Sequence, residues 1–598
     1  MKINNKINER INCLRSYLKK QRLDGYIQPR ADSFLGEYVP ESDERLKWIS
    51  GFSGSAGELL ILMNKTILFT DSRYTIQAKN ETKGNNIEVV ITSKTSIQNW
   101  LKNNIKNKIK ISIDPWLYSY SNLKKYIYFG LNNNIEFHIL KNNPIDIFWK
   151  YNRNKPNNAI NKHPLKYSGV STQKKLHNLC ENMKNNKVDA YVISHTDSLA
   201  WLLNIRGKDL KHTPIILARA IIFKNKQIFL FINKGRLKLS IVKYIRKQSN
   251  NLKIFQENNI LNKIKEISKL NKKIWIDPIA TPFIIAHTII NKKNNMYSNN
   301  CPIEMEKSIK NSTEIKGSIK AHEKDGIALC NFLYWLQSTK SNKLNEISAA
   351  NKIDNLRKKQ KNFLCTSFET ISGFASNGAI VHYRVSERTN KSFTKNNLYL
   401  CDSGGQYLEG TTDVTRTIII GKPSKLMKKE FTIVLKSHIA LADAKFPQGT
   451  TGNDLDVIAR NPLWKNHMNY GHGTGHGVGS CLSVHEGPHR ISKGSLIPLQ
   501  PGMITSNEPG YYKNNKYGIR IENLMVVLKD KNYKSNDLLY FKTLTLAPIE
   551  KNLIDYSLLN KEEIKWINNY NLNVYKSIAN KVTLKVKNWL KRTCKPYK

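Results

Sequence analysis

Cysteine is scarce in this sequence, and long apolar runs are missing from it. Eight cysteines among 598 residues, with no CxxC pair, indicate neither a disulfide scaffold nor a zinc ribbon and favour a reducing compartment. No apolar run approaches the roughly 18 residues that a membrane-spanning helix needs. The first 20 residues also lack the apolar core of a secretory signal. We therefore expect a cytoplasmic protein without a membrane partner.

Glycine and proline, at 30 and 19 residues, are also few and follow no repeat, which excludes collagen-like and mucin-like chains. Aromatic residues are spread along the whole length, so disorder is not expected as the main state. At roughly 100–200 residues per domain, a chain of 598 residues predicts three to five domains.

Acidic residues are in short supply as well. Asp and Glu number 46 against 96 Lys and Arg, which gives a formal net charge of +50. Such a surplus is typical of proteins that bind nucleic acid, but those proteins concentrate their charge in a patch or tail. Here lysine is scattered and accompanies asparagine and isoleucine, as in residues 102–110, which is typical of drift toward AT-rich codons. We therefore expect no specific nucleic-acid partner.

Apolar runs and helical patterns alternate in the first half of the chain, as expected for α/β domains. The clearest predicted elements are one helix and four strands: 173–187 for the helix, and 25–27, 59–62, 66–70 and 189–193 for the strands. Stretches rich in Asn and Lys at residues 152–163 and 291–300 are predicted breaks between domains. No internal repeat is visible.

The last part of the chain opens with a predicted helix, because Asn311 and Glu314 form the pattern of a capping box before an apolar periodicity. Residues 398–527 are predicted to be mostly strand and turn. Apolar residues at helical spacing in residues 553–590 predict a closing helical extension. The predicted fold class is therefore a multidomain combination of α/β and α+β.

Two aspartates lie close together at the start of the strand-rich region. Asp402 ends the apolar run 398–402, and Asp413 follows 11 positions later, after a turn that contains glycine. On neighbouring strands of a hairpin, both carboxylates could point to one place. Aspartate is disfavoured in strands, so a functional role is one interpretation, and a pair of turn-capping aspartates is the other.

Histidines alternate with glycines in residues 471–479. This string holds His472 and His476, and His485 follows nine positions after the second of them. Glycine at this density fits neither a helix nor an ordinary strand, and it leaves the imidazoles unhindered. Histidine is a frequent metal ligand and proton carrier. A single histidine is more often a core residue, but three in this context favour a site.

Two glutamates complete the set. Glu508 stands just before a Pro-Gly turn, and Glu522 follows 14 positions later, so the two could lie on paired strands. If residues 518–523 form a strand, Arg520 and Glu522 share one of its faces. The alternative for that pair is an exposed ion-pair stripe of little energetic value.

Four carboxylates and one imidazole in a short stretch would repel one another without cations. Five such side chains suffice for two divalent ions if two carboxylates bridge them. A set rich in oxygen with one nitrogen favours Mn²⁺ over structural Zn²⁺, with Co²⁺ or Zn²⁺ as alternatives. Two such ions can activate a bridging water for amide hydrolysis.

Strings around these residues resemble the pita-bread metallopeptidases of family M24B. They are DSGGQYLEGTTDVTRT, GHGTGHGVGSCLSVHEGP, NEPGYY and YGIRIEN. Residues 377–383 resemble the stretch that carries the family's upstream histidine. The details resemble aminopeptidase P, the Xaa-Pro aminopeptidase, in its long three-domain form. Further similar strings extend the resemblance over nearly the whole chain: 50–57, 70–74, 199–207 and 541–589.

The resemblance implies two creatinase-type N-terminal α/β domains, a pita-bread catalytic domain and a C-terminal helical extension. The expected boundaries are residues 1–155, 165–305, 308–530 and 531–598. It also implies a homodimer, and N-terminal domains that cover the site and admit only short peptides. The preference for proline at the second position would come from the shape of the pocket.

The resemblance also implies a role for each candidate residue. The metal ligands would be Asp402, Asp413, His476, Glu508 and Glu522, of which the second and the last would bridge the ions. Glu508 would also assist proton transfer from the bridging water. His382 and His485 would bind substrate and stabilise the tetrahedral intermediate. His472 would line the pocket, and Arg520 would orient the neighbouring carboxylates.

The expected activity is release of the N-terminal residue by hydrolysis of an Xaa-Pro bond. A prolidase-like dipeptidase is an alternative that the GHGTGHG string and the C-terminal extension disfavour. Methionine aminopeptidase is disfavoured by the length of the chain. An inactive pita-bread module that binds nucleic acid or protein is the alternative from another class. Such modules usually lose metal ligands, and all five are present here.

Overall fold

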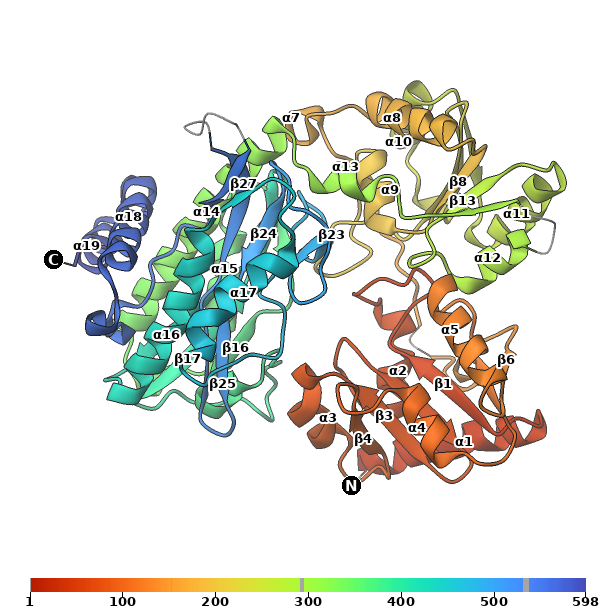
Figure 1. The fold of residues 1–598 in the computed structure, drawn as a ribbon, viewed down its shortest axis with the longest axis horizontal. Helices are drawn as coiled ribbons and strands as arrows, with labels where there is room; N and C mark the ends of the chain where they lie inside the picture. The colour runs from red at the N-terminus through yellow and green to blue at the C-terminus, as the bar shows by residue number, and fades with distance from the viewer. Residues whose placement is uncertain (1, 152, 291–294, 531–536, 598) are drawn as a thin grey trace. The chain divides into compact units, whose positions relative to one another are not determined.

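The computed structural model describes residues 2–151, 153–290, 295–530 and 537–597, and the chain divides into two compact units (Figure 1). The N-terminal unit consists of Met1–Lys162, Ser171–Leu210 and Ile215–Ile303. The C-terminal unit consists of His163–Val170, Lys211–Pro214 and Glu304–Lys598.

Two six-stranded sheets with the same topology form the N-terminal unit. Their strand orders are β4-β3-β2-β1-β5-β6 and β12-β11-β10-β8-β13-β14. In each sheet three central strands pair antiparallel, and the outer strands join them in parallel. The sequence showed no repeat, because strand pairing depends on the order of apolar runs and turns, which two dissimilar sequences can share.

The strands of these sheets are short and mostly buried. In the first sheet they are β1 (Gly25–Pro29), β2 (Glu58–Leu62), β3 (Thr66–Thr70), β4 (Glu88–Ile91), β5 (Ile109–Ile113) and β6 (Ile135–Ile139). In the second they are β8 (Ala190–Ile193), β10 (Arg219–Phe223), β11 (Gln227–Phe231), β12 (Asn251–Phe255), β13 (Ile274–Ile276) and β14 (Met296–Ser298). The four predicted strands are confirmed.

Helices connect these strands and cover the sheets. They include α1 (Lys2–Lys20), α2 (Arg45–Ser50), α3 (Thr75–Thr82), α4 (Ile97–Asn104), α5 (Tyr120–Leu131), α8 (Thr172–Asn185), α9 (Thr196–Leu202), α10 (Leu239–Gln248), α11 (Ile260–Lys269) and α12 (Phe283–Ile290). Helix α8 confirms the predicted helix. Of the predicted break at 291–300, residues 291–294 lie outside the described residues, and β14 occupies part of the rest.

Antiparallel sheets dominate the C-terminal unit. One has the order β16-β17-β20 and another the order β21-β28-β27-β24-β22-β23, and β25 and β26 form a hairpin. Their bounds are β16 (Ile371–Phe374), β17 (Asn397–Ser403), β20 (Val414–Ile420), β21 (Lys445–Pro447), β22 (Gly475–Gly477), β23 (Glu486–Ile491), β24 (Ile504–Asn507), β25 (Gly510–Lys513), β26 (Tyr517–Arg520), β27 (Asn523–Lys529) and β28 (Leu538–Thr543). A small third sheet contains β15 (Phe363–Thr366), β18 (Gly405–Tyr407) and β19 (Gly410–Thr411).

Long helices pack on these sheets. They are α14 (Ser312–Ser338), α15 (Glu346–Lys358), α16 (Lys425–Ala442) and α17 (Gly452–Trp464). The predicted capping box of Asn311 and Glu314 is confirmed at the start of α14. Residues 398–527 are mostly strand and turn, as predicted, but α16 and α17 also lie within this segment. Each has a helix start signal that the analysis missed, namely the Ser424 cap of α16 and the capping box of Thr451 and Asp454 in α17.

The predicted closing helices are confirmed as α18 (Lys561–Ile578) and α19 (Leu584–Thr593). Figure 1 shows them in dark blue, and their apolar residues join the core formed by α14, α16, β17 and β20. The extension also contributes β28, which pairs with β27 in the six-stranded sheet. The C-terminal residues therefore complete the sheet as well as covering the unit.

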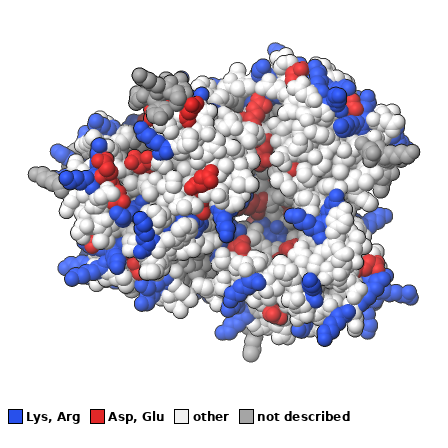
Figure 2. Space-filling model, in the orientation of Figure 1, with Lys and Arg blue, Asp and Glu red and all other residues white. Residues whose placement is uncertain are grey.

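The structure also shows where apolar helices and charged side chains lie. Within the described residues, no helix is both long and apolar enough to cross a membrane. On the face drawn in Figure 2, Lys and Arg are dispersed among acidic and neutral residues. That face therefore carries no single basic patch of the kind that phosphate backbones require.

Candidate metal centre

The two aspartates lie at the same end of two paired strands, β17 and β20. Asp402 lies in β17, opposite Thr415 of β20, and Asp413 lies immediately before β20. Both are buried, at 8% and 4% exposed. The hairpin prediction is confirmed in its pairing, although β18 and β19 form part of another sheet within the connection.

The histidine and the two glutamates come from three neighbouring strands. His476 is the middle residue of β22, and Glu508 directly follows β24. Glu522 directly precedes β27, and the last residue of β24 pairs with the first residue of β27. Residues 518–523 are not one continuous strand, because β26 ends at Arg520 and β27 begins at Asn523. Glu522 is 1% exposed and so is Arg520, which excludes the exposed ion-pair stripe.

The five side chains converge. One ligand atom from each of Asp413, His476 and Glu522 lies within 4.8 Å of the others. The Nε2 atom of His476 is 3.5 Å from Oδ2 of Asp413 and 3.4 Å from Oε1 of Glu508. Asp402 joins through Arg520, whose Nη2 donates to Oδ2 of Asp402 at 2.7 Å.

The donor set fits divalent cations. Nδ1 of His476 lies 3.0 Å from the carbonyl oxygen of Gly477 and therefore carries the ring proton, since a carbonyl only accepts. The Nε2 lone pair then faces carboxylate oxygens, which is repulsive unless a cation lies between them. Within the described residues, Oδ1 of Asp402 and Oδ1 of Asp413 are buried without a hydrogen-bond partner. Buried acceptors in this state are rare and call for a ligand.

Electrostatics point the same way. Burial raises the pKa of Asp413, and the carboxylate of Asp402 raises it further. Burial also raises the pKa of Glu522, with Asp413 as the next cause. The pKa of Glu508 rises to about 7, again mainly through burial. Without cations the cluster therefore holds protons that divalent ions would replace.

A hydrogen-bonded chain connects the predicted pocket histidine to the carboxylates. Nδ1 of His472 donates to the carbonyl of Gly473, so its Nε2 accepts from the Tyr512 hydroxyl at 2.8 Å. That hydroxyl accepts from Nη1 of Arg520 at 2.6 Å. Tyr512 was not predicted as a site residue, although it stands in the NEPGYY string, two positions after the Pro-Gly pair.

The other two histidines occupy different surroundings. The ring of His485 lies edge-on to that of His476, with centroids 4.3 Å apart. His382 follows Val381, whose carbonyl lies 3.5 Å from Nη1 of Arg520. Both histidines are half-buried. The structure thus places His485 against a candidate ligand, and it places the backbone beside His382 near Arg520.

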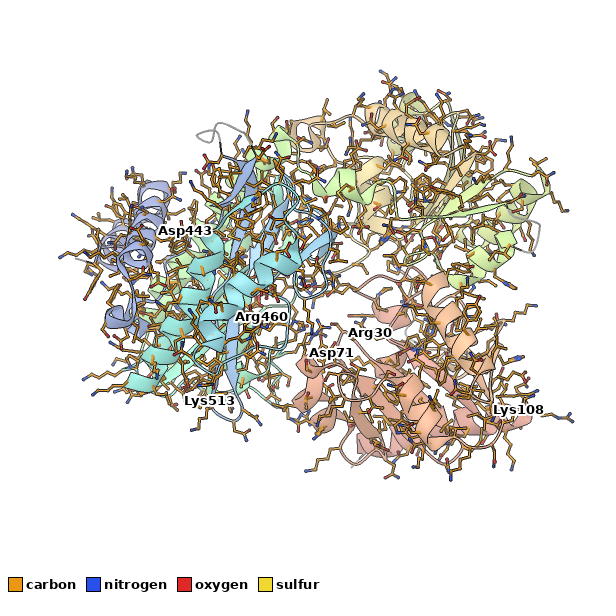
Figure 3. All side chains as sticks on the ribbon, viewed as in Figure 1. Arg30, Asp71, Lys108, Asp443, Arg460 and Lys513 are labelled. Atoms are coloured by element: carbon orange, nitrogen blue, oxygen red, sulfur yellow. The ribbon has the colours of Figure 1, made fainter. Side chains whose placement is uncertain are left out.

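Side chains of α17 hold the glycine- and histidine-rich segment 471–479 in place. Nη2 of Arg460, labelled in Figure 3, donates to the carbonyl of His472 at 2.7 Å, and its Nε donates to Asp456 at 2.7 Å. Asp456 also accepts from the Thr474 hydroxyl. Strand β22 can pack closely against its neighbours only because His476 stands between two glycines. A Cβ on Gly475 would lie 2.0 Å from the carbonyl oxygen of Ser506.

We expect the Gly475→Ala variant to lose about 3 kcal/mol of unfolding free energy and most of its activity, since backbone must move to admit the methyl group. Urea unfolding and peptide hydrolysis would measure both effects. Gly473→Ala is the matched control in the same loop, because its nearest contact would be 3.3 Å, to the Ser492 side chain. Parental stability and activity in Gly475→Ala would contradict the close packing around His476.

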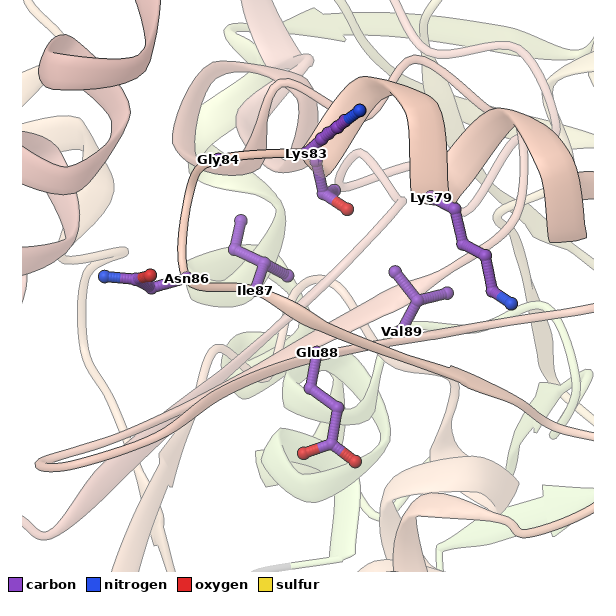
Figure 4. Close-up of a pocket in the computed structure, with 8 residues that line it drawn as sticks. Lys79, Lys83, Gly84, Asn86, Ile87, Glu88 and Val89 are labelled. Atoms are coloured by element: carbon purple, nitrogen blue, oxygen red, sulfur yellow. The ribbon is translucent and has the colours of Figure 1, made fainter.

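Another hollow on the molecule has different chemistry. An open depression of about 490 Å³ is lined by residues of α3, β4 and their connection (Figure 4). Lys79 and Lys83 line it together with Ile87, Val89 and one carboxylate, Glu88. Since a single carboxylate cannot form a dinuclear centre, this depression does not compete with the candidate metal centre.

The fold and the site together define a class, the pita-bread metallohydrolases, in which strand ends gather acidic side chains and one imidazole. The sequence pattern of metallopeptidase family M24 matches residues 317–529, and that of the C-terminal region of peptidase M24 matches 537–597. Two patterns of the creatinase/prolidase N-terminal domain match 10–129 and 152–314.

Named relatives cover the whole chain. Xaa-Pro aminopeptidase 1 of Dictyostelium discoideum is 36% identical, over 99% of this chain and 96% of its own. The probable Xaa-Pro aminopeptidase P of Laccaria bicolor is 37% identical, over 98% and 93%. The chain belongs to metallopeptidase family M24 and, within it, to the Xaa-Pro aminopeptidases, so it is a metal-dependent peptidase.

Solved structures agree. The X-prolyl aminopeptidase of Caenorhabditis elegans, described as a cytosolic enzyme with a di-nuclear active site, superposes with a TM-score of 0.94. It is 32% identical, and the match covers 99% of this chain and 100% of that one. The Xaa-Pro dipeptidase of Bacillus anthracis, at 22% identity and a TM-score of 0.51 over 64% of this chain and 99% of that one, shares the fold.

Proposed function

We propose that the chain releases the N-terminal residue of short peptides whose second residue is proline, at a centre of two divalent ions. The observation that carries this is the convergence of the His476 Nε2 atom on carboxylate oxygens of the buried Asp413 and the half-buried Glu508. The named relatives and the di-nuclear site of the Caenorhabditis elegans enzyme support it.

Five residues would hold the ions: Asp402, Asp413, His476, Glu508 and Glu522. By the resemblance to the family, Asp413 and Glu522 would be the two ligands that serve both ions. Each is buried, and a neighbouring carboxylate raises its pKa after burial itself. Four carboxylates with one imidazole favour Mn²⁺, with Co²⁺ or Zn²⁺ as alternatives. When bound, two such ions polarise a carbonyl and lower the pKa of water.

The chain's own residues supply the proton transfers and the positioning. By the resemblance to the family, Glu508 would also assist proton transfer from the water. His382 and His485 would bind the peptide and donate to the oxyanion of the tetrahedral intermediate. His472 would line the pocket through its bond to Tyr512, and Arg520 would keep Asp402 in place.

Specificity follows from the substrate. Proline lacks an N–H and has a fixed φ angle, so a pocket shaped to it accepts an imide bond that other peptidases handle poorly. We also propose a cytoplasmic homodimer, in line with the cytosolic enzyme of Caenorhabditis elegans for its compartment. The proposed domains are residues 1–155, 165–305, 308–530 and 531–598.

The test is hydrolysis of the tripeptide Arg-Pro-Pro by the purified protein, after chelation and again after addition of Mn²⁺. We expect chelation to abolish cleavage and Mn²⁺ to restore release of arginine alone. Arg-Ala-Ala is the control and should stay uncut. Cleavage of the dipeptide Arg-Pro without cleavage of Arg-Pro-Pro would instead identify a prolidase-like dipeptidase.

The inactive binding module makes a different prediction. Binding to phosphate backbones weakens steeply with salt, whereas catalysis in a buried site responds little to it. No cleavage with Mn²⁺, Co²⁺ or Zn²⁺, together with salt-sensitive binding of nucleic acid, would favour the module. All five candidate ligands are present and gathered, which argues for the peptidase.

A further inference from the structure

Arg416 lies in a cage of neutral oxygen atoms behind the candidate metal centre. It is 3% exposed, and within the described residues it forms no ion pair. All three of its nitrogens donate hydrogen bonds. The acceptors are the carbonyl oxygens of Thr415 (2.9 Å), Glu522 (2.7 Å), Ala547 (2.7 Å) and Pro548 (3.1 Å), Oδ1 of Asn523 (2.8 Å) and the hydroxyl of Tyr570 (2.8 Å).

One side of this cage consists of the strands that carry the candidate bridging ligands. The Glu522 N–H donates to the carbonyl of Thr415 at 3.2 Å, and the Thr415 hydroxyl donates to Oε2 of Glu522 at 2.7 Å. Nη1 of Arg416 donates to the carbonyls of both residues. Thr415 follows Asp413 by two positions, so this single nitrogen fixes the two backbones on which Asp413 and Glu522 stand.

The other side of the cage belongs to the C-terminal extension. Tyr570 of α18 is 6% exposed, and its hydroxyl donates to the carbonyl of Ala547 at 2.7 Å while it accepts from Arg416. Nη2 of Arg416 donates both to this hydroxyl and to Oδ1 of Asn523. Nδ2 of Asn523 lies 3.1 Å from Nε2 of His438 in α16. Without Tyr570 the guanidinium would lose a buried acceptor and the partner that orients it.

Burial of the Arg416 guanidinium costs free energy, which suggests that this residue has a role besides stability. A buried guanidinium without a carboxylate partner is expensive, and apolar residues of similar volume would usually serve stability as well. Its planar fork, however, can hold several acceptors in fixed directions, which neither a lysine nor an apolar side chain can do.

We propose that Arg416 is a positioning residue for Asp413 and Glu522, and that the C-terminal extension maintains it through Tyr570. The extension thereby takes part in catalysis without contacting the substrate. This inference rests on the proposed function, since it concerns residues that would hold the ions. Partners behind metal ligands typically change metal affinity or activity by about 10–100-fold.

The test compares Tyr570→Phe with the parent protein. We expect its affinity for Mn²⁺, measured by calorimetric titration of the metal-free protein, to fall about tenfold. Its kcat on Arg-Pro-Pro should fall by a similar factor, while KM stays within about twofold. The matched control is Tyr575→Phe, on the same helix and half-buried, which should equal the parent in both measurements.

A second variant separates charge from geometry. Arg416→Lys keeps the positive charge but loses the fork, so it should weaken Mn²⁺ binding at least as much as Tyr570→Phe. A folded Tyr570→Phe protein with parental Mn²⁺ affinity and kcat would overturn the proposal, even if it unfolds at lower urea concentration. A parent that neither binds Mn²⁺ nor cleaves would overturn the proposed function instead.

Discussion

Replacing Asp413 with asparagine is expected to lower hydrolysis of Arg-Pro-Pro by about four orders of magnitude, or ~5 kcal/mol of transition-state stabilisation. Asparagine keeps the shape of the side chain but provides one carbonyl oxygen and no charge. Asp413 is 4% exposed and lies beside Asp402 and Glu522, so the substitution removes a negative charge and one ligand oxygen from the interior of the cluster. Steady-state kinetics with saturating Mn²⁺ would measure the loss.

The same variant should be more stable than the parent when both are free of metal. Burial, and then the carboxylate of Asp402, raises the pKa of Asp413. Folding of the metal-free parent must therefore either bury this charge or protonate the group, and asparagine avoids both costs. Opposite signs for activity and metal-free stability distinguish a metal ligand from a structural aspartate. Asp443→Asn, at the exposed end of α16 (Figure 3), is the control and should leave both unchanged. A fully active Asp413→Asn protein would contradict the proposed centre.

Metal is expected to stabilise the C-terminal unit increasingly as the pH rises. In the metal-free folded state the pKa of Glu508 is about 7, above its ordinary value of 4.5. Below pH 4.5 the group is protonated in both folded and unfolded chains and costs nothing. Between pH 4.5 and about 7 the unfolded chain releases the proton first, so the free energy of unfolding falls by about 3 kcal/mol.

Mn²⁺ removes this loss, because it replaces the protons that the folded cluster would otherwise hold. Urea unfolding at pH 5 and pH 8, each with chelator and with Mn²⁺, would measure the difference. We expect a small stabilisation by Mn²⁺ at pH 5 and a much larger one at pH 8. An equal effect at both values would show that the carboxylates are not coupled as the geometry indicates. The Asp413→Asn variant should show a weaker pH dependence.

The candidate metal ligands could be predicted from the sequence because most of them stand in short, recognisable strings at the ends of strands. Asp402 and Asp413 lie on either side of one turn, and Glu508 directly precedes a Pro-Gly pair, so a local pattern sufficed to select them. The density of glycines around His476 likewise indicated an unusual backbone, and a Cβ on Gly475 would lie 2.0 Å from the carbonyl oxygen of Ser506. Periodicity also predicted α8, α14 and the closing helices.

Other features were beyond the reach of local pattern. Helices α16 and α17 lie inside a segment that was predicted to be mostly strand and turn. They were not predicted, because their capping signals were weighed less than the neighbouring strands. The two N-terminal sheets share a topology without a visible sequence repeat. Tyr512 gained a role only when the β25–β26 hairpin brought its hydroxyl to Arg520.

The sequence by itself determined the class of chemistry, since the types and order of the candidate ligands specify an oxygen-rich centre with one nitrogen. Only the tertiary structure decided how that centre is held. Arg416 and Tyr570 are 154 positions apart, and nothing local to either residue indicates the other. The physical reason is that the acceptors of a buried guanidinium come from segments that only the packed fold brings together. A metal ligand at the end of a strand, in contrast, is specified by the residues next to it in the sequence.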